Sequence, residues 1–298
     1  MKNLVDLKEH VAITGSNGFV GSKLNQRLPN ARILDLDKKH RLEEIDTLKT
    51  FLEDVKVVFH LAEINAGSGY SPANKSMIKN NVLATRNLID GVRRFCSEKP
   101  LIVLLSSIHV YSAEEDIYTE NSEIGPSSYY GLTKLVQELL IQEAAKNGLV
   151  DYCIFRGSNI YGAGCRPNYN SAVATFIDRI EKNEKLELFG NGESQLDLIY
   201  VDDVINILIR AGEDSQFKND VYNLSYGSSV SIKKLIDILK TVTQTQPEIR
   251  LVNSVPAKLT VNNSKLKKVL GTYAFVDLQK GLEMTIKKKS CKPTLVVT

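Results

Sequence analysis

Short apolar runs alternate with amphipathic stretches through the first half of the 298-residue chain. Unbroken apolar runs of this length are typical of parallel strands that are buried on both faces. They predict strands over residues 10–14, 31–36, 56–61, 101–106 and 151–155. The residues between them have helical spacing, which predicts helices over 18–28, 43–53, part of 73–95, and 129–146. This alternation favours the α/β class, in which right-handed crossovers wind the elements into a doubly wound parallel sheet.

The pattern changes after about residue 161. A loop rich in glycine, proline and asparagine leads to a predicted helix over 172–182, a strand over 185–188, and helices over 204–211 and 232–241. The lysine-rich end of the chain, from Ile286, is expected to be a solvated tail. We therefore divide the chain into a Rossmann-like sheet domain over 1–165, rejoined by part of 195–230, and a smaller α+β lobe over 166–298.

Composition narrows the class of protein. The chain is 43% hydrophobic, and its 38 Lys and Arg against 35 Asp and Glu leave a net charge of only +3. The hydrophobic fraction excludes general disorder, and the lack of a basic block argues against nucleic acid as a partner. The longest aliphatic stretch, residues 101–105, is too short to span a bilayer, so no membrane partner is expected. The four cysteines are scattered and form no CxxC pair, so we expect neither disulfides nor a metal site: Cys96, Cys153, Cys165 and Cys291. Cysteines used in this way are typical of a cytoplasmic protein.

Three glycines follow the first predicted strand and begin the first predicted helix. In such a loop the first glycine permits a tight turn, the second lets the backbone approach a dinucleotide diphosphate, and the third allows the helix to pack against the strand. Unpaired N–H groups at the start of the helix then face the phosphates. The sheet domain is therefore predicted to bind NAD(P) through a loop that comprises Gly15, Asn17, Gly18, Phe19, Val20 and Gly21.

The second predicted strand ends in acidic residues, with Asp35 as the first candidate and Asp37 as the second. A carboxylate at this place accepts hydrogen bonds from the adenosine ribose and repels a 2′-phosphate, which favours NAD over NADP. Lys38, Lys39 and Arg41 follow directly. Because a basic side chain accommodates a 2′-phosphate, NADP is not excluded.

A tyrosine and a lysine four residues apart, Tyr130 and Lys134, share one face of the fourth predicted helix. Ser107 follows the fourth predicted strand, and ligands of parallel sheets bind beyond the carboxyl ends of the strands. A free phenol has a pKa of ~10, which the positive charges of Lys134 and of an oxidised nicotinamide are expected to lower. Tyr130 can then exchange a proton with a substrate hydroxyl that Ser107 orients, while hydride moves between the same carbon and the cofactor.

With these residues in place, the sequence resembles the extended short-chain dehydrogenases/reductases of the NAD-dependent epimerase/dehydratase family. The motifs that carry the resemblance run through most of the chain. In order they are TGSNGFVG (14–21), VVFHLA (57–62), SSIHVY (106–111), YGLTK (130–134), FRGSNIYG (155–162) and FGNGESQLDLIYVDDV (189–204).

The resemblance implies roles for particular residues. Ser107, Tyr130 and Lys134 correspond to the family's catalytic triad. By the same resemblance, Asn159 contacts substrate, and the cofactor cleft is lined by His60, Leu61 and Ala62. Members of the family mostly act on nucleotide-linked sugars, and they commonly form homodimers through the helices that fall here within 73–95 and 129–146.

Departures from the family pattern are also informative. Ile108 and His109 stand where the family's 4,6-dehydratases carry an Asp-Glu pair, which argues against water elimination. GDP-fucose synthases carry a cysteine at the place of His109, so this histidine is either a substrate-contacting proton donor or a structural residue. Leu196 stands where the family carries a diphosphate-binding arginine, and Arg166 is the candidate substitute. Glu63, which follows the His-Leu-Ala motif, is expected to be a solvated loop residue.

Three functions fit this set of residues. A nucleotide-sugar epimerase keeps NAD bound, oxidises the sugar 4-hydroxyl to a transient ketone and returns the hydride to the other face. An NAD(P)H-dependent reductase of 4-keto-deoxysugar nucleotides is the alternative, since it uses the same side chains in the opposite direction. A non-catalytic cofactor-binding protein is the third, although such a protein has no chemical need for Ser107, Tyr130 and Lys134 together. We favour the epimerase, because it requires no group beyond these three.

Overall fold

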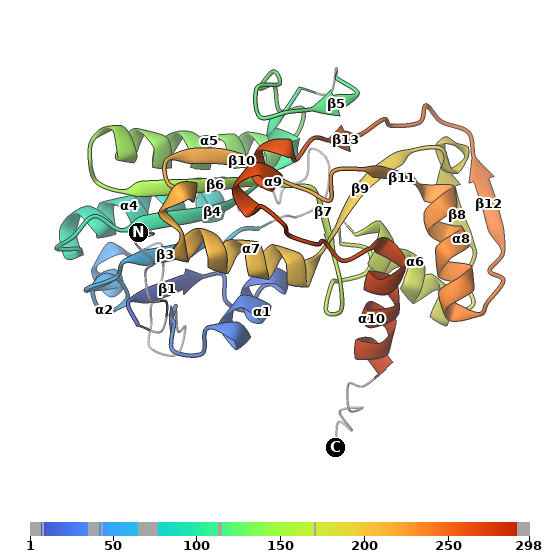
Figure 1. Cartoon of the computed structure of the whole chain (residues 1–298), viewed down its shortest axis with the longest axis horizontal. Helices are drawn as coiled ribbons and strands as arrows, with labels where there is room; N and C mark the ends of the chain where they lie inside the picture. Colours follow the sequence, from blue (N-terminus) through green and yellow to red (C-terminus); the bar gives the residue numbers. More distant parts are fainter. Residues whose placement is uncertain are drawn as a thin grey trace.

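The computed structural model describes residues 7, 9–34, 42, 44–64, 77–112, 115–169 and 171–290. A six-stranded parallel sheet lies at its centre, with the strand order β2-β1-β3-β4-β6-β10 (Figure 1). The strands are β1 (Val11–Thr14), β2 (Arg32–Ile33), β3 (Val57–His60), β4 (Leu101–Ser107), β6 (Asp151–Gly157) and β10 (Asp220–Leu224). Each of the five predicted strands overlaps one of these, and β10 is a strand that the apolar pattern did not predict.

Helices cover both faces of the sheet (Figure 1). α1 (Phe19–Arg27) and α7 (Val201–Glu213) pack on one face. The other face carries η1 (Ile45–Leu48), α2 (Lys49–Leu52), the π-helical turn η2 (Ile78–Leu83), α4 (Ala84–Phe95) and α5 (Tyr129–Lys146). No helix in the described part of the chain has the length and hydrophobicity needed to cross a membrane. The predicted doubly wound α/β fold is confirmed.

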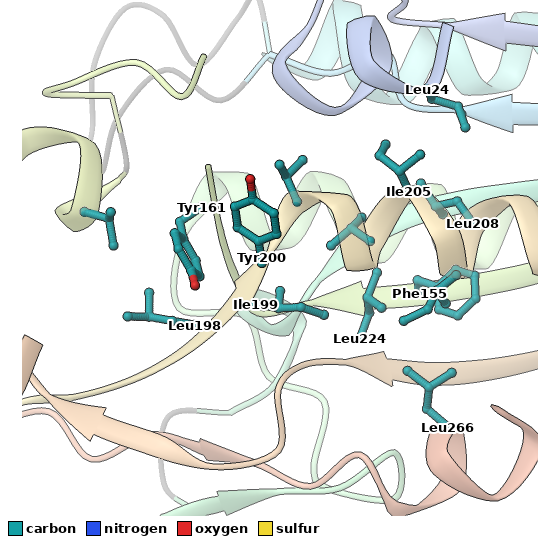
Figure 2. Close-up of a cluster of buried hydrophobic side chains, with 14 of the residues drawn as sticks. Leu24, Phe155, Tyr161, Leu198, Ile199, Tyr200, Ile205, Leu208, Leu224 and Leu266 are labelled. Carbon is teal, nitrogen blue, oxygen red and sulfur yellow. The ribbon is translucent and has the colours of Figure 1, made fainter. Parts of the chain in front are cut away.

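Alternate residues of each central strand enter different cores. Val57 and Phe59 of β3 pack among side chains of α1 and α7, whereas Val58 between them packs with α4 and α5. The same division holds for β4, where Val103 lies in the first core and Ile102 in the second. Figure 2 shows the first core, which continues from the sheet into the C-terminal lobe. Burial on both faces explains why these strands are continuous apolar runs in the sequence.

The second half of the chain builds the smaller sheets that extend from the carboxyl side of the main sheet. One sheet joins β7 (Asn159–Tyr161), β9 (Gln195–Tyr200) and β11 (Ser229–Ser231), and two-stranded pairs join β8 (Leu186–Phe189) to β12 (Ile249–Val252) and β5 (Ile117–Tyr118) to β13 (Thr260–Val261). The helices here are α6 (Ala172–Glu181), α8 (Ile232–Thr243), α9 (Ser264–Leu270) and α10 (Leu278–Ser290), with the short turns η3 (Ile108–Val110), η4 (Gly190–Gly192) and η5 (Ser215–Phe217). α6 and α8 each begin after a serine whose hydroxyl accepts a hydrogen bond from an N–H of the first turn.

The prediction of a solvated tail from Ile286 is wrong for the residues up to 290. These residues complete α10, whose apolar side packs on the core through Leu282 and Ile286. Its lysine-rich side faces outward, and Lys288 forms an ion pair with Asp202 of α7 at 3.1 Å. Packing is so close that a Cβ on Gly281 would lie 2.0 Å from the hydroxyl oxygen of Tyr161. The prediction failed because the high lysine content was taken as a sign of a solvated tail, whereas the lysines form the polar side of an amphipathic helix.

Replacing a core phenylalanine is expected to destabilise this fold far more than replacing an exposed one. Phe59 of β3 is fully buried, and Phe59→Ala should lower the free energy of unfolding by about 3–5 kcal/mol. Phe189 is 56% exposed, and Phe189→Ala should change it by about 0.5 kcal/mol or less. Urea denaturation of both variants measures the difference. Equal losses would contradict the assignment of the core.

Candidate active site

The candidate site lies where the chain leaves two neighbouring strands for opposite faces of the sheet. β1 and β3 are paired side by side, yet α1 follows β1 on one face and α4 follows β3 on the other. Ligands of open α/β sheets bind at such a point, beyond the carboxyl ends of the strands. Four segments meet here, namely the glycine loop after β1, residues 61–64 after β3, Ser107 at the end of β4, and the first turn of α5.

The glycine loop requires its first and third glycines for steric reasons. Gly15 has a φ of +72°, and a Cβ there would lie 2.5 Å from the carbonyl oxygen of Leu61. A Cβ on Gly21 would lie 2.0 Å from the carbonyl oxygen of Gly15, so α1 packs directly on the turn. The turn itself is closed by a 2.9 Å hydrogen bond from Gly18 N to Gly15 O. These are the tight turn and the close helix packing that the sequence predicts.

The same loop leaves polar backbone available to a ligand. Asn17 and Gly18 are exposed, Phe19 and Val20 are half-buried, and the N-cap position of α1 provides no side-chain hydrogen bond to the first turn. Helix N–H groups of this kind attract anions. The residues present therefore fit a dinucleotide diphosphate, which the N–H groups at the start of α1 would hold.

The acidic residues predicted to bind the adenosine ribose, Asp35 and Asp37, lie outside the described residues. Their role stays a prediction, as does the preference for NAD over NADP that depends on it. Among the described residues, no group of three or more His, Cys, Asp and Glu side chains is arranged to hold a metal ion.

Residues 61–64 are clamped at both ends by side chains of other elements. The Thr14 hydroxyl oxygen accepts hydrogen bonds from the N–H groups of Leu61 and Ala62, both at 3.1 Å. At the other end, the side chain of Asn81 in η2 accepts a hydrogen bond from Ile64 N at 2.8 Å and donates one to Ile64 O at 3.1 Å. Leu61 and Ala62 therefore lie beside the glycine loop, and their contact with the cofactor stays a prediction. Glu63, between the two clamps, is held in a defined place.

His60 is buried beneath residues 61–64, where it hydrogen-bonds to Thr14, and it does not line the cleft. The structure corrects that expectation, because His60 is only 1% exposed. Thr14 already accepts two N–H groups, so its single proton goes to His60 Nδ1 at 2.7 Å. The other ring nitrogen, Nε2, then carries the proton and donates to Thr85 Oγ1 at 2.8 Å. Burial, with the nearby Lys134, lowers the pKa of His60 to about 3, which keeps the ring neutral in this network.

The first turn of α5 is pressed against the end of β4 by a cap and a glycine. The hydroxyl of Ser128 accepts a hydrogen bond from Gly131 N at 3.0 Å and begins the helix. Gly131 then approaches η3 so closely that a Cβ would lie 2.1 Å from the carbonyl oxygen of His109. This contact sets the height of Tyr130 and, one turn later, of Lys134 above the sheet.

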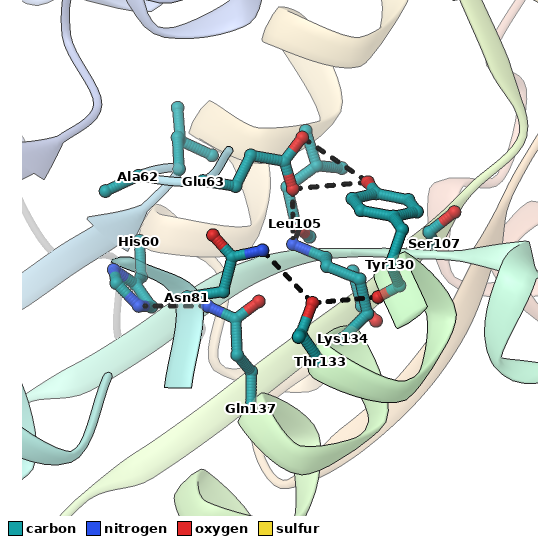
Figure 3. A network of polar contacts seen from close by, with 12 residues as sticks. His60, Ala62, Glu63, Asn81, Leu105, Ser107, Tyr130, Thr133, Lys134 and Gln137 are labelled. Carbon is teal, nitrogen blue, oxygen red and sulfur yellow. Dashed lines mark hydrogen bonds and ion pairs between the residues drawn. The ribbon is translucent and has the colours of Figure 1, made fainter. Parts of the chain in front are cut away.

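Ser107, Tyr130 and Lys134 come together at this place, and Glu63 joins them (Figure 3). The ammonium group of Lys134 donates to Glu63 Oε2 at 2.7 Å and to the carbonyl oxygen of Leu105 at 2.6 Å. The hydroxyl of Tyr130 donates to Glu63 at 3.2 and 3.4 Å to the two carboxylate oxygens. Glu63 is an exposed loop residue, as expected, but it is also bound to both Tyr130 and Lys134. Its partners lie 67 and 71 residues away in the sequence, so no spacing rule links them.

Tyr130 is a neutral phenol in this arrangement. Loss of hydration and the adjacent Glu63 carboxylate raise the pKa of Tyr130 well above its usual value, although a hydrogen bond from Ser107 acts in the other direction. The sequence predicts a lowered pKa of Tyr130 when Lys134 and an oxidised nicotinamide both lie beside it. Here the positive charge of Lys134 is neutralised by the same carboxylate that binds Tyr130, so Lys134 alone does not lower the pKa of the phenol. The effect of the cofactor stays a prediction.

Two residues expected to contact substrate have different surroundings. The exposed ring of His109 meets Tyr130 edge to face, with 5.9 Å between the ring centroids, so it lies at the mouth of the site. Asn159 lies in β7 and donates its side-chain amide to the backbone carbonyl of Asp197 in β9 at 3.1 Å. Asn159 is half-buried and joins two strands of the lobe.

Arg166 lies in the loop after β7, which passes Phe19 of α1 and carries Tyr169 near Tyr130. A Cβ on Gly164 of this loop would be 3.9 Å from the ring of Phe19. The guanidinium of Arg166 lies over the ring of Tyr169 at 5.9 Å, and Tyr169 contributes to the electrostatic environment of Tyr130. The loop therefore carries one cationic side chain beside Tyr169, which lies near Tyr130.

This fold and site define a dinucleotide-dependent enzyme, and comparisons with known proteins agree. The model of the NAD dependent epimerase/dehydratase family matches residues 11–225. A putative UDP-glucose 4-epimerase of Methanocaldococcus jannaschii is 31% identical over 257 residues, which are 77% of this chain and 81% of the relative. A UDP-2-acetamido-2,6-beta-L-arabino-hexul-4-ose reductase of Pseudomonas aeruginosa is 29% identical over 71% of this chain and 51% of its own length.

The fold is also similar to that of solved epimerases. The crystal structure of UDP-glucuronic acid 4-epimerase from Bacillus cereus, in complex with UDP-glucuronic acid and NAD, superposes with a TM-score of 0.82 at 23% identity. The superposition covers 94% of this chain and 98% of the other. The chain belongs to the NAD-dependent epimerase/dehydratase family and is an enzyme of that family.

The buried His60 makes a specific contribution to the pH dependence of stability. Its pKa is about 3 in the folded chain and about 6.5 when unfolded, so between these values only the unfolded chain binds the proton. Stability is therefore fully present above pH 6.5 and lost as the pH falls towards 3. From pH 7 to 5, the free energy of unfolding should fall by about 2 kcal/mol more in the native protein than in His60→Gln. Urea denaturation at both pH values measures this, and equal losses would show that His60 is protonated when folded.

Proposed function

We propose that this enzyme is an NAD-dependent nucleotide-sugar epimerase that acts through a transient 4-keto intermediate. The observation that carries the proposal is the position of the Tyr130 hydroxyl, which lies in one crevice with Ser107, Lys134 and the glycine cradle. Bound NAD would supply a hydride acceptor and a positive charge beside Tyr130. The proposal is supported by the family and by relatives whose names are those of UDP-sugar epimerases.

The chain's own residues would divide the work as follows. Tyr130 removes the proton of the sugar 4-hydroxyl and later returns it, and Ser107 holds that oxygen in place. Lys134 has three N–H donors, of which Glu63 and Leu105 occupy two, so one remains for a hydroxyl of the cofactor ribose. The remaining residues proposed to bind the cofactor are Gly15, Asn17, Gly18, Phe19, Val20, Gly21, Asp35, Asp37, Leu61 and Ala62.

On the substrate side, we assign the nucleotide diphosphate to Arg166. Leu196 offers no charge where the family carries an arginine, whereas Arg166 lies in a loop that passes Phe19 of α1 and carries Tyr169 near Tyr130. His109 is proposed to contact the sugar because its exposed ring borders Tyr130. Asn159 is still proposed to contact the substrate, but only with the part of its surface that does not face β9. Its side-chain amide already donates a hydrogen bond to that strand.

We also propose that the cofactor and the sugar bind to different parts of the chain. Residues 1–165 would bind the cofactor and 166–298 the sugar, and the segment 195–230 contributes β10 to the main sheet. We place the enzyme in the cytoplasm. Cys96, Cys153 and Cys165 are free thiols in the structure, and the cytoplasm would keep them reduced.

An NAD(P)H-dependent reductase of 4-keto sugar nucleotides is the second candidate, and one observation favours it. Epimerisation returns the same proton to the sugar, whereas each reduction takes a proton from Tyr130 that has to be replaced. The partly exposed carboxylate of Glu63, hydrogen-bonded to Tyr130, is suited to replace it.

Incubation with single nucleotide sugars and no added cofactor tests the proposal. A UDP-sugar should be converted to a mixture of its C4 epimers, followed by NMR, and Tyr130→Phe should slow the conversion by about 10²–10⁴-fold. Consumption of added NAD(P)H only in the presence of a 4-keto sugar nucleotide would establish the reductase instead. Unchanged turnover in Tyr130→Phe would contradict both.

We also propose a homodimer through α5 and the η2–α4 segment. Leu132 and Leu139 are exposed two turns apart on α5, and Ile78 and Leu83 are exposed on η2, which packs beside it. Leu139→Glu should convert the dimer to a monomer, because it places a charge in a desolvated apolar surface. Sedimentation equilibrium measures the mass, with Leu251→Glu on the exposed strand β12 as the control. A native protein of 33.2 kDa in solution would refute the dimer.

A further inference from the structure

Glu63 lies in this site, but the epimerase chemistry described above assigns it no role. Its carboxylate binds the Tyr130 hydroxyl and the Lys134 ammonium at the same time, at 3.2 and 2.7 Å (Figure 3). The flanking residues on both sides are held by Thr14 and Asn81, so the contact is built into the fold. Exposed ion pairs contribute only about 0–1 kcal/mol to stability. Stability alone therefore gives little reason for a surface carboxylate to have two such partners.

The two charged side chains differ in their exposure to solvent. The side chain of Lys134 is 2% exposed and that of Glu63 is 32% exposed, and the carboxylate of Glu63 also accepts a hydrogen bond from the hydroxyl of Tyr130. The other groups that face Tyr130 are Ser107, His109 and Tyr169. His109 meets Tyr130 edge to face, with 5.9 Å between the ring centroids. Glu63 combines a direct hydrogen bond to the Tyr130 hydroxyl with a carboxylate side chain that is 32% exposed, so it can exchange protons between Tyr130 and water.

We propose that Glu63 is a positioning residue that passes protons between solvent and Tyr130, so that the site can perform net reduction of a keto sugar nucleotide. The inference rests on the proposed role of Tyr130 and deepens the second candidate function. In one turnover the keto carbon would accept a hydride, with two electrons, from bound NAD(P)H, which would become NAD(P)+, and the C=O double bond would become a C–O single bond. The proton of Tyr130 moves to that oxygen. Glu63, protonated from water, then restores the proton of Tyr130.

The first test is spectroscopic and needs neither substrate nor turnover. The ionisation of Tyr130 is followed by tyrosinate absorbance as the difference between the protein and its Tyr130→Phe variant, with and without NAD. Glu63→Gln removes the negative charge beside the phenol and frees the charge of Lys134, so the midpoint for Tyr130 should fall by about one to three pH units. Glu143→Gln, the same exchange on an exposed part of α5, should leave it unchanged.

The second test is chemical rescue in the reductive direction. Glu63→Ala should reduce kcat with NADPH or NADH and a 4-keto sugar nucleotide by about tenfold or more, and added formate should restore most of it by replacing the carboxylate. Formate should not restore Glu63→Gln, because the amide fills the place that formate requires. The affinity for NAD should change much less than kcat in both variants.

The outcomes separate this inference from the function on which it rests. If Tyr130→Phe abolishes turnover while Glu63→Gln shifts no midpoint and formate rescues nothing, Glu63 has only a structural role and the inference is overturned. If Tyr130→Phe leaves turnover unchanged, the proposed function itself fails. If the midpoint shifts and formate rescues Glu63→Ala, both stand.

Discussion

The placement of the whole site depends on one hydroxyl group, that of Thr14 at the end of β1. It accepts the N–H groups of Leu61 and Ala62 and donates to the buried His60, so the ends of the two central strands are held together. Each buried polar group left without its partner would cost about 1–3 kcal/mol, which makes this junction rigid. The glycine loop and Glu63 continue from the two strand ends. For this reason the phosphate cradle and the tyrosine that would move protons share one crevice.

Charge balance is the second constraint, and it links stability to chemistry. A buried ammonium such as that of Lys134 is strongly unfavourable unless it is paired and hydrogen-bonded, and Glu63 and the Leu105 carbonyl satisfy it. The carboxylate that stabilises Lys134 also binds Tyr130 and opposes its ionisation. In the proposed chemistry, Tyr130 would therefore need another positive charge in the site to act as a base, whereas it would need none to act as a proton donor. This asymmetry is what distinguishes the site from a simple tyrosine–lysine pair.

Much of the fold follows from local patterns, and part of the site does not. The apolar strands and α5 were predictable because burial on both faces and helical spacing leave a periodic record in the sequence. β10 and the lobe strands β7 and β11 were missed because three to five residues of mixed polarity carry no such record. The glycine loop and the Tyr130–Lys134 pair lie in local motifs, so sequence spacing identified them. Glu63 has partners on a helix 67 residues and more away, and His60 is buried by contacts that arise only from the strand order.

The most direct test of the account is a crystal structure of the protein with NAD bound. We expect the diphosphate at the loop from Gly15 to Gly21, the nicotinamide ribose within hydrogen-bond distance of Lys134 Nζ, and the Tyr130 hydroxyl beside the nicotinamide ring. A cofactor bound away from the β1–β3 junction would contradict it. So would a nicotinamide ring that the Tyr130 hydroxyl cannot reach.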